Sequence, residues 1–121
     1  MEPSHALASN SSKIAITRVG SRNVLTPKGS ITYQNLDTLK IMFKECLNGN
    51  KNEIILDCAA ISFLDSETLE FLIGMHEDLK NRGGSLKLVN VTDICQDIFI
   101  ATRLINLFNL YQDIHQVLRS G

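Results

Sequence analysis

Alternating polar and apolar positions predict a β-hairpin at the start of the patterned part of the chain. Residues 13–18 (KIAITR) alternate as a half-buried strand does, and residues 23–29 (NVLTPKG) form a second run that can pair with the first across residues 20–22. Because Pro27 has no backbone N–H to give to a neighbouring strand, it confines the second run to a sheet edge or a strand end.

Apolar residues at three- and four-residue steps predict two helices, over residues 33–47 and from residue 65 to about 81. A glycine-containing turn follows each of them, at residues 48–50 and 82–84, where a helix stop is expected. The apolar faces consist of Leu36, Leu39, Phe43 and Leu47 in the first helix and of Leu69, Leu72, Ile73, His76 and Leu79 in the second.

The rest of the chain continues the alternation of strand and helix. Residues 53–57 (EIILD) predict a buried strand that runs into a packed loop with Ile61, Phe63 and Leu64. Residues 86–89 predict another strand, and residues 110–114 a last one before a final helical turn. Between these two strands, Thr92 caps a helix that carries Ile94, Ile98 and Ala101. This order predicts an α/β fold with a parallel or mixed sheet and right-handed crossovers.

Length and charge limit the choices of domain and partner. A chain of 121 residues with 44% hydrophobic content suits one domain, over residues 13–121, after a small, polar and flexible tail at residues 1–12. The net charge of −1 comes from scattered charges, which argues against nucleic acid as a partner. Since no apolar run is long enough to span a bilayer and the first residues lack a leader pattern, we expect a cytoplasmic protein without a membrane partner.

Cysteines and histidines give no sign of metal or disulfide chemistry. Cys46, Cys58 and Cys95 are odd in number and far apart, and each lies in an apolar pattern, which favours buried reduced thiols. His5, His76 and His115 stand singly, with no second ligand at metal-binding spacing. We therefore expect no metal.

Catalytic motifs are missing as well. The chain has no GxSxG, no GxGxxG after the first strand, no phosphate-binding Walker loop and no HExxH. An enzyme with Ser66 as nucleophile would need a base, and no histidine has an orienting carboxylate beside it in the sequence. The expectation is a protein that is not an enzyme and holds no cofactor.

Ser66 is the residue with the clearest functional potential. It stands at the start of the second predicted helix, where backbone N–H groups are unpaired and the helix dipole is positive. A phosphate there would be well placed, yet Asp, Ser and Thr are also the ordinary capping residues of any helix. Local chemistry leaves both the cap and the phosphate acceptor open.

The order of motifs resembles a STAS domain of the anti-sigma factor antagonist family. The matching features are the strand that ends in Asp57, the Asp65-Ser66 pair that opens a helix, the turn at residues 82–84, the strand SLKLVNV and the helix TDICQDIFIATRL. Upstream, GSIT at residues 29–32 takes the place of the family's Gly-Glu-Ile/Leu-Asp. The resemblance extends over roughly residues 13–118.

This resemblance implies the STAS fold, with a central mixed sheet of four to five strands and helices packed against it. It also implies partner switching. The unmodified protein binds a serine kinase or anti-sigma factor, phosphorylation of Ser66 releases it, and a PP2C-type phosphatase removes the phosphate. The residues placed at the partner surface are Thr32, Asp65, Ser66, Glu67 and Thr68.

Three positions depart from the family pattern. Glu67 and Thr68 stand where Ser-Gly is usual, so Glu67 puts a permanent charge beside Ser66, and Thr32 stands where the family usually has an acid. The third departure is the pair Ile61-Ser62 before Phe63, where Ser62 is a nearby hydroxyl that could compete as acceptor, although a turn is the more ordinary role for it.

A receiver domain is the alternative, because a strand that ends in Asp57 is also what a phospho-accepting aspartate looks like. A receiver needs an acid pair after its first strand to hold Mg²⁺, and residues 13–20 offer none. The strand predicted late in the chain also lacks the lysine that is usual in a receiver domain.

Overall fold

Five strands form the central sheet in the order β1-β2-β4-β6-β7, and two short strands, β3 and β5, form a second sheet. The structure is a computed structural model that describes residues 14–20, 22–47 and 53–120. The strands are β1 (Ile14–Val19), β2 (Arg22–Pro27), β3 (Gly29–Ile31), β4 (Glu53–Asp57), β5 (Ile61–Leu64), β6 (Ser85–Val89) and β7 (Asn109–Tyr111), and the helices are α2 (Leu36–Cys46), α3 (Ser66–Asn81), α4 (Asp93–Ala101) and α5 (Ile114–Ser120).

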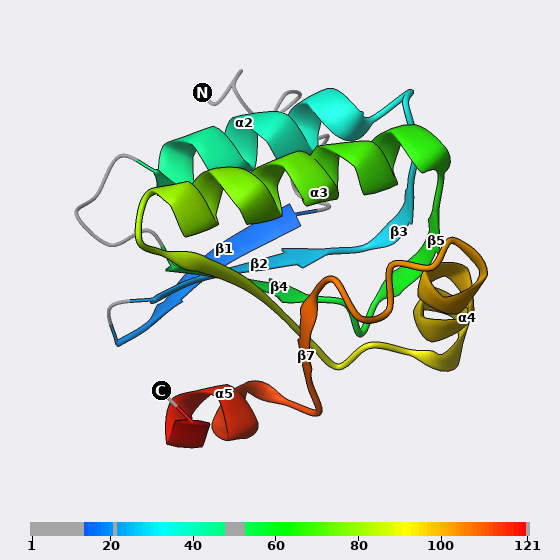
Figure 1. The fold of residues 1–121 in the computed structure, drawn as a ribbon. Coiled ribbons are helices and arrows are strands. Elements are labelled where there is room, and N and C mark those ends of the chain that lie inside the picture. The colour runs from blue at the N-terminus through cyan, green and yellow to red at the C-terminus, as the bar shows by residue number, and fades with distance from the viewer. Residues whose placement is uncertain (1–13, 21, 48–52, 121) are drawn as a thin grey trace.

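The predicted hairpin and the mixed sheet are confirmed. β1 and β2 pair antiparallel, with Ile16 opposite Leu25, and Pro27 is the last residue of its strand. From β2 onward the neighbours β4, β6 and β7 all run parallel. These parallel strands follow each other across the sheet in one direction, so right-handed connections place their helices on the same face. Figure 1 shows α2 and α3 lying side by side over that face.

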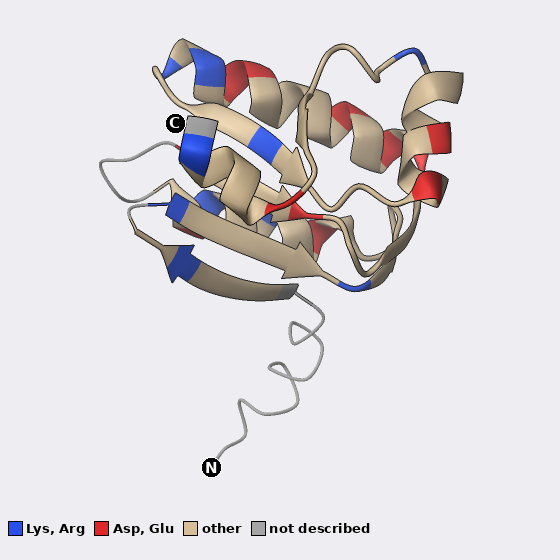
Figure 2. Cartoon of the chain, turned by 90° about the horizontal axis from the view of Figure 1, so that it is seen from below, with Lys and Arg blue, Asp and Glu red and all other residues tan. Residues whose placement is uncertain are grey.

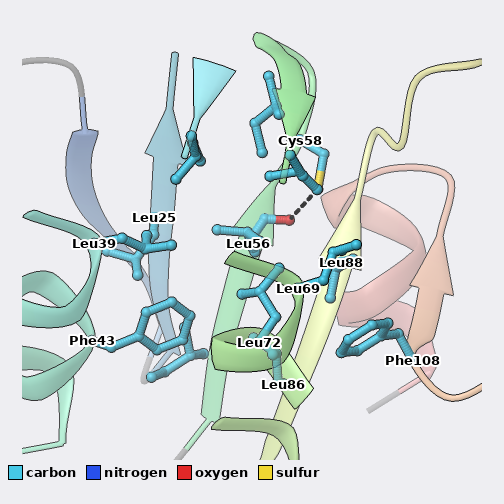
Figure 3. Packing of buried hydrophobic residues seen from close by; sticks show 14 of the residues in the cluster. Leu25, Leu39, Phe43, Leu56, Cys58, Leu69, Leu72, Leu86, Leu88 and Phe108 are labelled. Carbon is cyan, nitrogen blue, oxygen red and sulfur yellow. Dashed lines mark hydrogen bonds between the residues drawn. The ribbon is translucent and has the colours of Figure 1, made fainter. Parts of the chain in front are cut away.

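The main core lies between this face and the two helices. Figure 3 shows Leu25, Leu56 and Leu88, from three neighbouring strands, among Phe43 and other buried side chains from the helices. A smaller cluster lies on the opposite face of the sheet, where α5 packs Val117 against the strands. Figure 2 views the molecule from the side on which α5 lies. Burial on both faces explains why β4 reads as a continuous apolar run.

The predicted loop after β4 is wrong in its second half. Residues 61–64 form strand β5, which pairs in parallel with β3, and a register shift between Gly29 and Ser30 interrupts the ladder. Ile61 and Leu64 are buried as expected, whereas Phe63 is 46% exposed. Ser62 therefore lies on a strand and not in a turn, with its hydroxyl 3.2 Å from that of Ser30.

Helix ends and faces differ in part from the prediction. α2 begins three residues later than expected, and Ile114 belongs to α5 instead of to the last strand. Thr92 caps α4 as predicted, since its hydroxyl accepts from the backbone N–H of Cys95. The buried residues of α4 are, however, Cys95 and Phe99, and both Ile94 and Ala101 are exposed.

Other predictions have mixed outcomes. All three cysteines are buried free thiols, as expected. The turn after α3 contains Gly83 at φ +82°, which fits a glycine stop. No helix in the described part of the chain is long and apolar enough to cross a membrane. The predicted tail at residues 1–12 lies outside the described residues.

Candidate functional site

Asp65 joins two segments that lie far apart in the sequence. It follows β5 directly and is the N-cap of α3, where one carboxylate oxygen, Oδ1, accepts from the backbone N–H of Thr68 at 2.9 Å. The other oxygen, Oδ2, accepts from the backbone N–H of Tyr33 at 2.8 Å. A single side chain therefore caps the helix and holds the segment after β3 against it.

The side chain of Thr68 is inside the protein. It is fully buried, and its hydroxyl lies 2.9 Å from the carbonyl oxygen of Ile31 and 2.8 Å from Asp65 Oδ1. Thr68 was predicted to contact a partner, but a buried side chain presents no atoms to one. Its role is to position Asp65 and to tie the helix start to the end of β3.

These hydrogen bonds also set the charge of Asp65. Desolvation acts to raise the pKa of the carboxyl, but the hydrogen bonds from Thr68 and Tyr33 outweigh it and hold the pKa below its ordinary value. Asp65 is therefore a carboxylate at neutral pH, in agreement with its position at a positive helix end.

Thr32 lies in a short loop that its own hydrogen bonds fix beside Asp65. The backbone N–H of Thr32 donates to Asn35 Oδ1 at 2.8 Å, and Asn35 Nδ2 donates to the carbonyl of Ser30 at 2.8 Å. The hydroxyl of Thr32 accepts from the backbone N–H of Gln34 at 3.3 Å. The loop is thus ordered without the acid that the family usually has at this position.

Ser66 is exposed at the first position of α3. The helix cap is Asp65 and not Ser66, so the hydroxyl of Ser66 is not used for capping and makes no hydrogen bond within the described part of the chain. Glu67, the next residue, is exposed as well. The structure therefore brings Thr32, Asp65, Ser66 and Glu67 together at the start of α3. Of the five residues predicted at the partner surface, Thr68 is the one whose side chain is buried.

Two exposed aromatic residues adjoin this group, and the sequence had not placed them at the site. Tyr33 is 64% exposed and follows Thr32, and Phe63 is 46% exposed two residues before Asp65. Phe63 is paired with Ser30 in the ladder between β3 and β5. In the sequence, each aromatic residue is next to or near a motif residue, which was the available signal. Only the pairing of β3 with β5 and the hydrogen bond from Tyr33 to Asp65 bring the two segments together.

Asp57 has a structural role at the carboxyl end of β4. Its Oδ1 accepts from the backbone N–H of Ala59 and from Asn90 Nδ2, both at 3.1 Å. Asn90 follows β6 and has a positive φ of 56°. The carboxylate of Asp57 thus holds the turns that follow two neighbouring strands. Among the described residues, no group of three His, Cys, Asp or Glu side chains is placed to hold a metal ion.

Comparison with known proteins identifies the family. A family model of the STAS domain matches residues 13–117 of the chain, which therefore belongs to the STAS domain family. The chain is therefore a STAS domain and not a receiver domain, the alternative that the strand ending in Asp57 had suggested. A search of curated protein sequences found no match.

Solved structures agree with the family. A candidate anti-sigma factor antagonist from Thermotoga maritima superposes with a TM-score of 0.81 at 19% identity, over 92% of this chain and 96% of that one. An anti-sigma factor antagonist from Mycobacterium paratuberculosis gives 0.77 at 20% identity, over 88% and 91%. The phosphorylated form of the Bacillus cell fate determinant SpoIIAA gives 0.68 at 16% identity, over 89% and 99%. The TM-scores show a shared fold, and at such low identities they show the fold alone. The STAS fold predicted from the motifs is confirmed.

Proposed function

We propose that the protein is a regulator of the anti-sigma factor antagonist type that acts by partner switching and has no catalytic activity of its own. In its unmodified state the surface around Ser66 binds a serine kinase of the anti-sigma type. Phosphorylation of Ser66 separates the two proteins, and a PP2C-type phosphatase restores the unmodified state. We place this cycle in the cytoplasm, where a kinase finds its ATP.

The observation that carries the proposal is the free, exposed hydroxyl of Ser66 directly after a capping aspartate in a STAS domain. Because Asp65 satisfies the cap, Ser66 can be modified without loss of a hydrogen bond that the fold needs. The relative SpoIIAA has been solved in both an unphosphorylated and a phosphorylated form, which supports the comparison.

Electrostatics explains how a phosphate would change binding while leaving the fold alone. A phosphate adds about −1.5 to −2 charges at a helix start whose dipole and unpaired N–H groups favour an anion. The same charge lies beside the exposed Glu67 and the carboxylate of Asp65, so the surface becomes strongly negative. A partner that packs against Tyr33 and Phe63 would have to desolvate that charge, and the complex would separate.

Two variants of Ser66 test the mechanism with purified kinases of the anti-sigma type from the same host. Ser66→Ala should keep kinase binding under phosphorylating conditions, and Ser66→Asp should weaken it by at least about tenfold, or 1.4 kcal/mol. Both should keep the melting temperature of the parent, because the side chain is exposed and an acid suits the first turn. The matched control is Ser62→Asp, an exposed serine nearby on β5, which should still be released when Ser66 is phosphorylated.

Mass spectrometry of protein taken from its host completes the test. A fraction of the chains should carry one phosphate, mapped to Ser66. A phosphate on Ser62 instead, or equal kinase binding by the Ala and Asp variants of Ser66, would contradict the proposed switch.

A further inference from the structure

β1 is an edge strand of the central sheet, and within the described part of the chain it pairs with β2 alone. Figure 2 shows it at the outer edge of the sheet, where the chain enters from the N-terminal segment. Ala15, Ile16, Thr17 and Arg18 are all exposed, and Ile16, in the middle of the strand, is a large apolar residue with 37% of its surface exposed.

This edge lacks most of the devices that keep an edge strand from pairing. Natural sheets protect their edges with prolines, bulges, very short strands or a covering segment. β1 has six residues, contains no proline and keeps an unbroken register with β2. The opposite edge is different, because β7 has only three residues and α5 packs against it. The edge at β1 is therefore the one that can extend the sheet.

The hairpin determines which backbone groups of β1 are open. Val19 and Arg22 are the last pair before a two-residue loop that starts with Gly20 at φ +66°, so they form the hydrogen-bonded pair of a tight hairpin turn. Hydrogen-bonded and non-hydrogen-bonded pairs alternate along antiparallel strands. The residues whose N–H and C=O groups point away from β2 are therefore Ile14, Ile16 and Arg18.

The far end of the hairpin agrees with this alternation. Ile14 lies opposite Pro27, which has no N–H to give. A proline fits at a pair that is not hydrogen-bonded, as the count from the turn requires.

We propose that two copies of the chain form a homodimer by pairing their β1 strands antiparallel about a two-fold axis, with Ile16 opposite Ile16 of the second copy. In this register Ile16 exchanges two hydrogen bonds with its counterpart, and Ile14 and Arg18 do so with each other on either side, which gives about six bonds. A shifted register would leave an end residue of each strand without a partner in the other β1. The open groups are thus self-complementary, as a two-fold contact requires, and this favours a second copy over an unrelated strand.

Side chains and charges fit the same register. Ile16 lies opposite Leu25 of the main core, so its side chain is on the face that carries α2 and α3. A two-fold axis perpendicular to the sheet keeps that face common to both copies, so the two Ile16 side chains lie against each other. Because Arg18 lies opposite Ile14 of the second copy, the two Arg18 Cα atoms are about 14 Å apart along the strands, beyond the range of strong repulsion at physiological salt.

The dimer would add contacts without using the Ser66 surface. α2 packs on β1 as well as on β2, so the pairing places the α2 helices of the two copies next to each other on one face. No residue of the Ser66 surface takes part, and the inference is therefore independent of partner switching.

Sedimentation of the full-length protein from about 1 μM to about 1 mM tests the association, and the mass should rise from that of one chain to that of two. Ile16→Pro removes an N–H from the open edge and none from the ladder with β2, so it should raise the dissociation constant at least about tenfold. Ile16→Lys places like charges opposite each other and should also weaken the dimer. Ile100→Lys, at an exposed isoleucine on α4, is the control that should leave it unchanged. A protein that stays monomeric throughout, or a dimer that both Ile16 variants leave unchanged, overturns the proposal.

Cysteine cross-linking tests the register itself. Residues opposite each other at a hydrogen-bonded pair have Cα atoms about 5.5 Å apart, within the range that a disulfide spans. Ile16→Cys should therefore give a disulfide-linked dimer under mild oxidation, while the three native cysteines are buried and do not compete. Arg18→Cys is the matched control on the same strand and should stay unlinked. Equal cross-linking by the two variants, or none by Ile16→Cys, would contradict the proposed pairing.

Discussion

At the scale of single residues, Asp65 determines how Ser66 is presented. Its carboxylate accepts hydrogen bonds from both Thr68 and Tyr33, so one side chain fixes the start of α3 and the loop that carries Thr32. A serine that follows such a cap is free of structural duties. The Ser66 hydroxyl is thus left unused because the carboxylate of its neighbour Asp65 caps the helix.

The lowered pKa of Asp65 predicts a stability contribution that depends on pH. A carboxyl whose pKa is depressed by folding stabilises the native state above its unfolded pKa, about 3.9, and that contribution is lost as pH falls through the folded pKa. We expect Asp65→Ala to lower the free energy of unfolding by about 1 kcal/mol at neutral pH, through loss of the cap.

Urea denaturation at a series of pH values measures this effect. The difference between the parent protein and Asp65→Ala should shrink below about pH 3.9. Asp37→Ala, which removes an exposed acid from the first turn of α2, should stay within about 0.5 kcal/mol of the parent. A difference for Asp65→Ala that is constant across the pH range would show that the carboxylate charge contributes nothing.

At the scale of elements, two glycines near each other in the chain have opposite requirements. Gly74 lies in the middle of α3, exposed, with no atom within 4 Å of where a Cβ would be. Gly83 follows the helix at φ +82°, a conformation that side chains strain. Gly74→Ala should therefore stabilise the protein by up to about 1 kcal/mol, and Gly83→Ala should destabilise it by about the same amount.

Chemical denaturation of the two variants shows directly whether each one raises or lowers the free energy of unfolding. Each variant is the control for the other. Because both changes add one methyl group, a common effect of the added carbon cancels in the comparison. Stabilisation by Gly83→Ala would mean that the turn after α3 is not the one described, and destabilisation by Gly74→Ala would mean that the exposed face of α3 is packed in solution.

The long elements could be predicted from sequence because their patterns are local, and the short ones could not. β3 and β5 have three and four residues, and the register shift between Gly29 and Ser30 leaves β5 with two exposed residues between two buried ones, which hides the period of two. In α4, apolar residues occur on more than one side, so the pattern does not select the face. Phe99 and Cys95 face the core, which leaves Ile94 exposed.

The same limit applies to the candidate site. Asp65 and Ser66 could be found because they are adjacent in the chain and open a helix. The burial of Thr68 and the position of Tyr33 depend on hydrogen bonds to residues more than thirty positions away, which no local pattern contains.

At the scale of the whole molecule, the strand order determines where α3 lies. The connections leave α2 and α3 on one face of the sheet, where α3 packs against β6. Its N-cap Asp65 and its residue Thr68 tie the start of the helix to the end of β3 and the loop that follows, through Ile31 and Tyr33.

Burial in the main core also predicts the reactivity of the cysteines. Cys46, Cys58 and Cys95 are at most 4% exposed, and burial raises the pKa of each thiol above its ordinary value. The reactive species is the thiolate, so native protein should react with a disulfide reagent only as fast as it unfolds. In denaturant all three thiols should react at once.

Ser66→Cys supplies the internal control, because a thiol at an exposed helix start favours the thiolate and should react rapidly in the folded protein. Rapid reaction of the parent protein under native conditions would show that the core opens without global unfolding, and it would place the opening at whichever cysteine carries the label.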